Sequence, residues 1–144
     1  VLISDNLSPR AAKIFRDRGL EVDVKVGMTP EELIACIGDY DGLAIRSATK
    51  VRENVLDAAT NLKVIGRAGI GVDNVDLNAA SARGVVVMNT PFGNSITTAE
   101  HAIALMFSLA RQIPAADQST QSGKWEKSRF MGVELTGKTL GIIG

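Results

Sequence analysis

Two residue types that build many functional sites are nearly missing from this chain of 144 residues, which has one cysteine and one histidine. A single cysteine excludes an internal disulfide and a metal site made of several thiolates. Cys36 lies in the apolar pattern of an expected helix, so we expect a buried free thiol rather than a nucleophile. A reducing, cytoplasmic environment is the expected location.

The one histidine, His101, lies in the first turn of an expected long helix, where a structural role is favoured over acid–base catalysis. The sequence has no H-E-x-x-H motif and no Ser-His-Asp order, and no His, Asp and Glu residues cluster at metal-ligand spacing. We therefore expect no catalytic residue and no metal ligand within this chain.

Net charge is also lacking, because sixteen basic residues balance sixteen acidic ones. Such a chain has no overall field to attract nucleic acid or an acidic membrane, and we expect neither partner. No apolar run approaches the roughly 18 residues of a membrane span, and no charged leader precedes an apolar stretch. The first residue is valine and the last follows a strand-like run, so we expect a chain trimmed at both ends.

The chain does contain a regular alternation of short apolar runs and helical patterns. Ser8-Pro9 and the capping box Thr29-Pro30-Glu31-Glu32 mark helix starts, and Gly19 marks a helix end. The expected strands are residues 1–3, 22–26, 42–45, 62–66 and 85–88, and further helices are expected at 51–59 and 77–83. This order predicts an α/β fold with right-handed crossovers and a parallel sheet covered on both faces, the second strand lying nearer an edge.

The character of the sequence changes between residues 90 and 95, where we place a boundary between two units. A capping box, Thr97-x-x-Glu100, precedes an expected helix over 99–113. That helix is apolar nearly all round, which predicts burial at a centre or a surface shared with another domain or subunit. Trp125, in a polar stretch, either packs on its own unit or inserts into a partner. A short strand is expected at 140–143.

Arginine follows two neighbouring strands of the expected sheet. Arg46-Ser47 comes after the third strand, and Arg67 with the loop Gly69-Ile70-Gly71 comes after the fourth. Ligands of open parallel sheets bind at this edge, and two arginines with exposed loop N–H groups can bind one small anion. The alternative is that both arginines pair with Asp5, Asp73 or Asp76 and only fix loops.

Two glycine patterns invite a nucleotide-binding interpretation, and both are weak. Gly66-x-x-Gly69-x-Gly71 is not the G-x-G-x-x-G of dinucleotide-binding turns, and no G-K-[ST] follows it. Gly144 could be the first glycine of such a motif, but it is only one of three.

Longer stretches resemble a known family: RSATKV at 46–51, GRAGIGVDNVDLNAA at 66–80, VMNTPFGNS at 87–95, AEHAIALMFSLARQIPAA at 99–116 and GKWEKSRFMGVELTGKTLGIIG at 123–144. They are similar to the NAD-dependent D-2-hydroxyacid dehydrogenases, and the last is most similar to members that act on 3-phosphoglycerate. The resemblance implies a flavodoxin-like substrate-binding domain at residues 1–91. Residues 92–144 would start a truncated Rossmann nucleotide-binding domain, with a crossover helix, a dimerisation arm and a first strand at 139–143.

The resemblance also implies residue roles. Substrate would be bound by Arg46, Ser47, Arg67, the hinge residue Asn94 and Lys127, the last reaching a neighbour's active site. Gly69, Ile70 and Gly71 would lie at the nicotinamide end of NAD. The family's catalytic residues and dinucleotide motif lie after the last residue here, so we expect the chain alone to be inactive and to bind NAD weakly. Residues 97–130 would make a homo-oligomer contact.

The implied reaction is the NAD-dependent oxidation of 3-phospho-D-glycerate to 3-phosphohydroxypyruvate, the first step of serine biosynthesis. A related dehydrogenase acting on glyoxylate or hydroxypyruvate is one alternative. A non-catalytic module that binds a small anion is the other.

Overall fold

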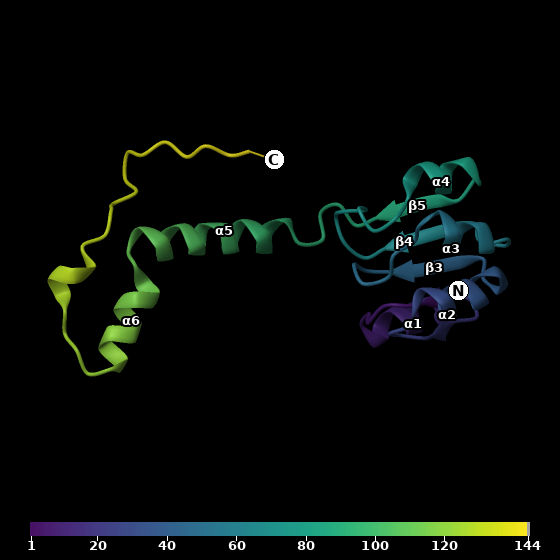
Figure 1. Cartoon of the computed structure of the whole chain (residues 1–144), viewed down its shortest axis with the longest axis horizontal. Helices are drawn as coiled ribbons and strands as arrows, with labels where there is room; N and C mark the ends of the chain where they lie inside the picture. Colours follow the sequence, from purple (N-terminus) through teal and green to yellow (C-terminus); the bar gives the residue numbers. More distant parts are fainter. Residues whose placement is uncertain (144) are drawn as a thin grey trace. The chain divides into compact units, whose positions relative to one another are not determined.

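The computed structural model describes residues 1–143 and divides into two compact units, Val1–Asn94 and Ser95–Gly144. Each unit is described by itself (Figure 1). Within the described residues no helix is long and apolar enough to cross a membrane. The same residues hold no group of three or more histidine, cysteine or acidic side chains that could bind a metal ion.

The first unit is built on a five-stranded parallel sheet in the order β2-β1-β3-β4-β5. The strands are β1 (Leu2–Ile3), β2 (Asp23–Val24), β3 (Gly42–Ile45), β4 (Val64–Arg67) and β5 (Val86–Asn89). The helices between them are α1 (Pro9–Asp17), α2 (Pro30–Cys36), the 3₁₀ turn η1 (Ile37–Asp39), α3 (Glu53–Ala58) and α4 (Leu77–Ala82). The predicted α/β class is therefore confirmed, as is the edge position of the second strand.

The start and end of α1 and the start of α2 lie where local chemistry predicts. Ser8 caps α1 ahead of a proline, and Thr29 and Glu32 form the reciprocal capping box of α2. Gly19 follows α1 with a φ of +78°, a backbone conformation that glycine adopts without strain.

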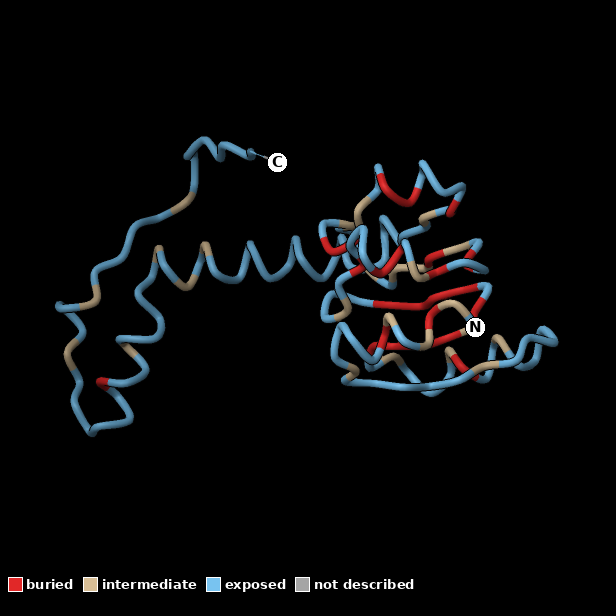
Figure 2. Tube along the Cα trace, turned by 45° about the vertical axis from the view of Figure 1, so that its right-hand side comes forward, coloured by how far each residue is buried: buried red, intermediate tan, exposed pale blue. Residues whose placement is uncertain are grey.

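Alternate residues of the central strands pack on opposite faces of the sheet. Leu43 and Ile45 join the larger apolar cluster with side chains of α2, α3 and α4, whereas Ala44 joins a smaller cluster with Ala12 of α1. Figure 2 shows the buried residues of this unit, which include all of β1 and β3 but none of β2 or β5. Cys36 is a free thiol, but it is half-buried at the margin of the larger cluster rather than fully buried.

The second unit contains α5 (Ser95–Ala110), α6 (Ile113–Gln121) and the 3₁₀ turn η2 (Lys127–Phe130). The predicted capping box at Thr97 is wrong, because α5 already begins at Ser95 and Thr97 lies inside it. Gln112, with a φ of +51°, separates α5 from α6, and Pro114 then fits the first turn of α6. No residue of α5 is buried within the described structure.

The expected strand at residues 140–143 is not formed among the described residues, where residues 138–143 have no regular secondary structure. Leu140 and Ile142 are 61% and 83% exposed. A β-strand is stabilised by hydrogen bonds to a neighbouring strand, and no strand lies beside these residues in the described second unit. An apolar run alone does not form one.

Candidate anion-binding site

The carboxyl ends of β3, β4 and β5 surround a cavity of about 460 Å³ in the first unit. The register of the sheet brings these three strand ends together, because Ile45 of β3 pairs with Arg67 of β4, which pairs with Asn89 of β5. The residues that follow these positions therefore leave the sheet at one edge. Among those lining the cavity are the predicted residues of this unit: Arg46, Ser47, Arg67, Gly69, Ile70, Gly71 and Asn94. Thr90 and Gly93 also line it and were not predicted, although both lie in the turn that follows β5.

Both arginines remain available to a ligand. Within residues 1–143 neither guanidinium forms an ion pair, so pairing with Asp5, Asp73 or Asp76 is not the arrangement in the structure. Asp76 instead caps α4, accepting from the Ala79 N–H at 2.9 Å. Paired N–H donors on two neighbouring strand ends suit a carboxylate or phosphate.

The turn that carries Arg46 is held by a buried carboxylate. Asp5, only 5% exposed, accepts hydrogen bonds from the Arg46 N–H at 2.6 Å, the Thr49 N–H at 3.0 Å and the Thr49 hydroxyl at 2.6 Å. The sequence had suggested Asp5 only as a partner for an arginine side chain. Its position directly after β1, at the same edge of the sheet, was the available signal for this backbone role.

The loop after β4 is held by its carbonyl groups, which leaves N–H groups free. Gly69 O accepts from the Thr90 N–H at 2.9 Å, and Ile70 O accepts from Asn89 Nδ2 at 2.7 Å. Within the described structure the N–H groups of Ile70 and Gly71 have no protein acceptor. They can therefore add neutral donors to the charged donors of the arginines.

Gly69 leaves the space in which the Arg67 guanidinium lies. A Cβ built on Gly69 would clash with Arg67 Nη1 and lie 2.8 Å from Cζ. We expect Gly69→Ala to displace this flexible side chain and to weaken binding of inorganic phosphate to the chain by about tenfold, with little change in melting temperature. Isothermal titration with phosphate measures the loss.

Gly66→Ala is the matched control, because a Cβ there meets no atom within 4 Å. We expect it to leave phosphate affinity unchanged. Equal affinity in the Gly69→Ala variant and the unmodified chain would show that the position of Arg67 does not matter for anion binding.

Lys127, the remaining predicted site residue, lies in the second unit at the start of η2. It lines a separate cavity of about 450 Å³ together with Trp125 and Phe130. Trp125 is 82% exposed, so it is not packed into its own unit. His101 is exposed on α5.

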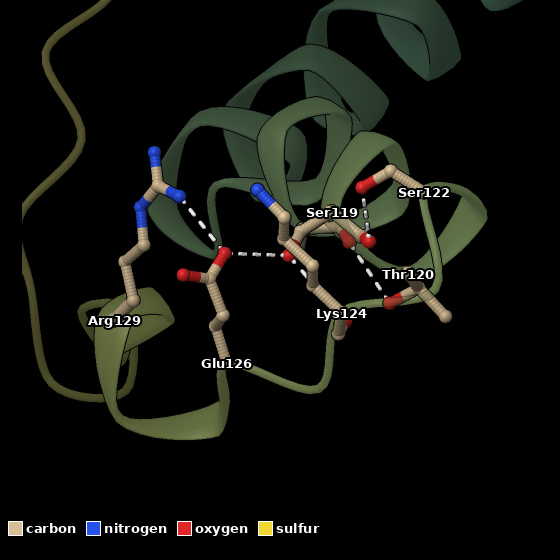
Figure 3. A network of polar contacts seen from close by, with 7 residues as sticks. Ser119, Thr120, Ser122, Lys124, Glu126 and Arg129 are labelled. Atoms are coloured by element: carbon tan, nitrogen blue, oxygen red, sulfur yellow. Dashed lines mark hydrogen bonds and ion pairs between the residues drawn. The ribbon is translucent and has the colours of Figure 1, made fainter.

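Glu126 anchors the segment that carries Lys127 (Figure 3). Its Oε2 accepts from the Ser119 hydroxyl at 2.8 Å and from Arg129 Nη1 at 2.9 Å. The hydrogen bonds from Ser119 and Arg129 lower the pKa of Glu126 below its usual value, and the bond from Ser119 has the larger effect. The Ser119–Glu126 contact joins α6 to the turn before η2.

This lowered pKa predicts a pH dependence for the Ser119–Glu126 contact. Because the folded pKa lies below the unfolded one, the contact stabilises the unit fully above the unfolded pKa and is lost as the pH falls through the folded value. A carboxyl-detected NMR titration should give a lowered midpoint for Glu126. Ser119→Ala should raise that midpoint, and an unchanged midpoint would contradict the assignment.

The described residues do not by themselves form a dinucleotide site. A pyrophosphate is held where a glycine-rich turn leads directly into a helix. The glycine pattern at 66–71 lacks this arrangement, because residues 69–71 are irregular and the next helix, α4, begins only at Leu77. Ile70, 42% exposed, offers only one apolar contact beside the arginines. The chain therefore fits an anion and, at most, one edge of a larger cofactor.

Comparison with known proteins identifies the class. The family D-isomer specific 2-hydroxyacid dehydrogenase, catalytic domain, matches residues 1–139. The chain belongs to this family.

Within the family, the chain is similar to enzymes of one kind. The chain is 57% identical to a D-3-phosphoglycerate dehydrogenase of Archaeoglobus fulgidus and 56% identical to that of Homo sapiens, in both cases over all 144 residues. It spans 27% of the length of each of these relatives, about a quarter.

Solved structures agree with this likeness. An NAD⁺-bound 3-phosphoglycerate dehydrogenase of Entamoeba histolytica matches 76% of the chain at 31% identity, with a TM-score of 0.63 and 39% of that structure covered. The TT0316 protein of Thermus thermophilus matches 94% of the chain at 33% identity, with a TM-score of 0.82 and 45% of that structure covered.

Proposed function

We propose that this chain is a segment of an NAD-dependent dehydrogenase that oxidises 3-phospho-D-glycerate to 3-phosphohydroxypyruvate. The observation that carries the proposal is the cavity lined by two arginines without ion-pair partners in the described structure and by exposed loop N–H groups. The names of the relatives that match the whole chain supply the substrate.

Two domains divide the work of this enzyme. Residues 1–91 are the substrate-binding domain, and residues 92–144 begin the nucleotide-binding domain. Arg46, Ser47, Arg67 and Asn94 bind the substrate, and Gly69, Ile70 and Gly71 lie beside the nicotinamide end of NAD. Lys127 contributes to a neighbouring subunit's site.

The substrate carries a carboxylate and a phosphate, so it needs cationic groups at more than one point. Arg46 and Arg67, on adjacent strand ends, supply two of them and orient the hydroxy acid. NAD would be held beside Gly69, Ile70 and Gly71 and would supply the acceptor for the hydride that leaves C2 of the hydroxy acid. The residues of this chain bind and orient, and proton transfer belongs to residues elsewhere in the enzyme.

Two measurements test the proposal. The full-length enzyme should oxidise 3-phosphoglycerate with a higher kcat/KM than it shows for an unphosphorylated 2-hydroxy acid, and equal efficiency would favour a glyoxylate or hydroxypyruvate reductase. The 144-residue chain should bind 3-phosphoglycerate but show no turnover with NAD. Turnover by this chain would show that it holds catalytic residues of its own.

We assign residues 97–130 to a contact between subunits of the same enzyme. Large apolar side chains of α5, among them Ile103, Leu105 and Leu109, are at least half exposed within the described structure. A purely monomeric chain in sedimentation velocity at tens of micromolar would argue against this contact. A cytoplasmic location completes the proposal, and cell fractionation would test it.

A further inference from the structure

Asn74 is a buried polar side chain between the two segments that carry the arginines. Only 1% of its surface is exposed. Its Nδ2 donates to Arg46 O at 2.7 Å and to Thr49 O at 2.8 Å, and its Oδ1 accepts from Arg67 Nε at 3.4 Å. One amide group therefore binds the backbone of the first segment and the guanidinium of the second.

The backbone holds Asn74 in this place. Asn74 O accepts from the Val51 N–H at 2.8 Å, and Val51 O accepts from the Asp76 N–H at 2.9 Å. These two bonds form a parallel bridge between Val51 and Val75, both of which are buried. The backbone at Asn74 is therefore held by hydrogen bonds on both sides of Val75, and this fixes the point from which the side-chain amide extends.

Asn74 and Asp5 hold the Arg46 turn from two sides. Asp5 accepts from the N–H groups of Arg46 and Thr49, while Asn74 donates to the carbonyl oxygens of the same two residues. Only a side chain with two donors can do the second task, so an aspartate of the same shape would place a negative oxygen against two carbonyls.

The contact with Asn74 also sets how Arg67 presents its charge. With Nε bound to Asn74, the two Nη groups of Arg67 have no protein acceptor among residues 1–143, and the group lies over Gly69. The paired Nη donors are then the ones left for a ligand.

We propose that Asn74 is a positioning residue that fixes the spacing of Arg46 and Arg67, so that both meet one substrate with two anionic groups. The identity of that substrate rests on the proposed function. The contacts of Asn74 do not depend on the proposed function. Asn74 is not among the residues that line the cavity, so it acts through the two arginines.

The first test is steady-state kinetics of Asn74→Asp in the full-length enzyme. We expect the KM for 3-phosphoglycerate to rise about tenfold or more, while the KM for NAD stays within about twofold. The effect should be smaller in an Arg67→Ala background, because part of it acts through Arg67. An unchanged KM for 3-phosphoglycerate with a lower melting temperature would overturn the proposal in favour of a purely structural role.

Asn61→Ala is the matched control. Asn61 also donates its amide to a backbone carbonyl, Gly38 O at 2.7 Å, but it is exposed and lies outside the cavity. We expect both KM values to be unchanged in this variant. A comparable rise in the KM for 3-phosphoglycerate would show that any loss of such a bond acts on the site, and would overturn the proposal.

The second test needs no variant and no substrate. In ¹⁵N NMR of the unmodified 144-residue chain, the Arg67 Nε–H should exchange with water at least about tenfold more slowly than the Arg46 Nε–H, which has no acceptor in the described structure. Equal exchange rates would overturn the positioning role. If the full-length enzyme does not oxidise 3-phosphoglycerate, the proposed function fails, and this exchange measurement still decides the role of Asn74.

Discussion

Arg67→Ala in the full-length enzyme is expected to lower kcat/KM for 3-phosphoglycerate by a factor of ten or more, a loss of about 1.4 kcal/mol or beyond. Arg67 is partly exposed at the end of β4, and its Nη groups have no other partner among residues 1–143. Removing the side chain deletes a charged donor pair from the cavity and takes away the 3.4 Å hydrogen bond to Asn74 Oδ1. The main effect should therefore fall on substrate binding rather than on folding.

Arg18→Ala provides the control for charge. Arg18 is the exposed C-cap of α1. The N-terminus of α1 follows the carboxyl end of β1, so Arg18 lies at the end of the helix that is farther from the cavity. Kinetics and thermal unfolding of both variants should be measured together, with Arg18→Ala close to the unmodified enzyme in each. An unchanged kcat/KM combined with a lower melting temperature for Arg67→Ala would make Arg67 a loop-fixing residue.

Asp5→Ala is expected to lower the free energy of unfolding of the 144-residue chain by about 3 kcal/mol. The carboxylate accepts three hydrogen bonds of 2.6–3.0 Å while only 5% exposed, and its removal leaves the N–H groups of Arg46 and Thr49 without an acceptor. A loss of this size is a large part of the stability of a small domain. Urea unfolding followed by circular dichroism gives the value.

Asp17→Ala is the corresponding control. Asp17 forms an exposed ion pair with Lys13 at 2.6 Å on α1, and such pairs contribute roughly 0–1 kcal/mol. Equal losses for Asp5→Ala and Asp17→Ala would show that the buried carboxylate is no more important than a surface one. Phosphate affinity of the Asp5→Ala variant, measured where it is folded, reports whether the Arg46 turn has lost its shape.

Much of the first unit could be predicted because its signals are local. Ser8-Pro9 and the capping box at Thr29 mark helix starts within a few residues of chain, and period-two and apolar runs mark strands. Arg46 and Arg67 could be placed together because parallel strands end at one edge of a sheet. Each of these inferences needs only neighbouring residues and a known rule of topology.

The failed strand prediction depended on a distant partner. Residues 140–143 have the composition of a strand, but a strand needs a second strand beside it. Thr97 and Glu100 have the spacing of a capping box, yet α5 begins two residues earlier, at Ser95. The apolar side chains of α5 and Trp125 indicate a surface that another surface covers, but the sequence does not identify that second surface.

The sequence by itself determined the class of fold, the order of its elements and the two arginines at the strand ends, because periodicity, caps and turn residues act over short stretches of chain. Only the tertiary structure decided how those arginines are held. Asp5 and Asn74 are separated by about half of the chain, and they meet at the Arg46 turn because β1, β3 and β4 pair side by side. A hydrogen bond between residues so far apart in sequence depends on the register of the sheet, which no local pattern records.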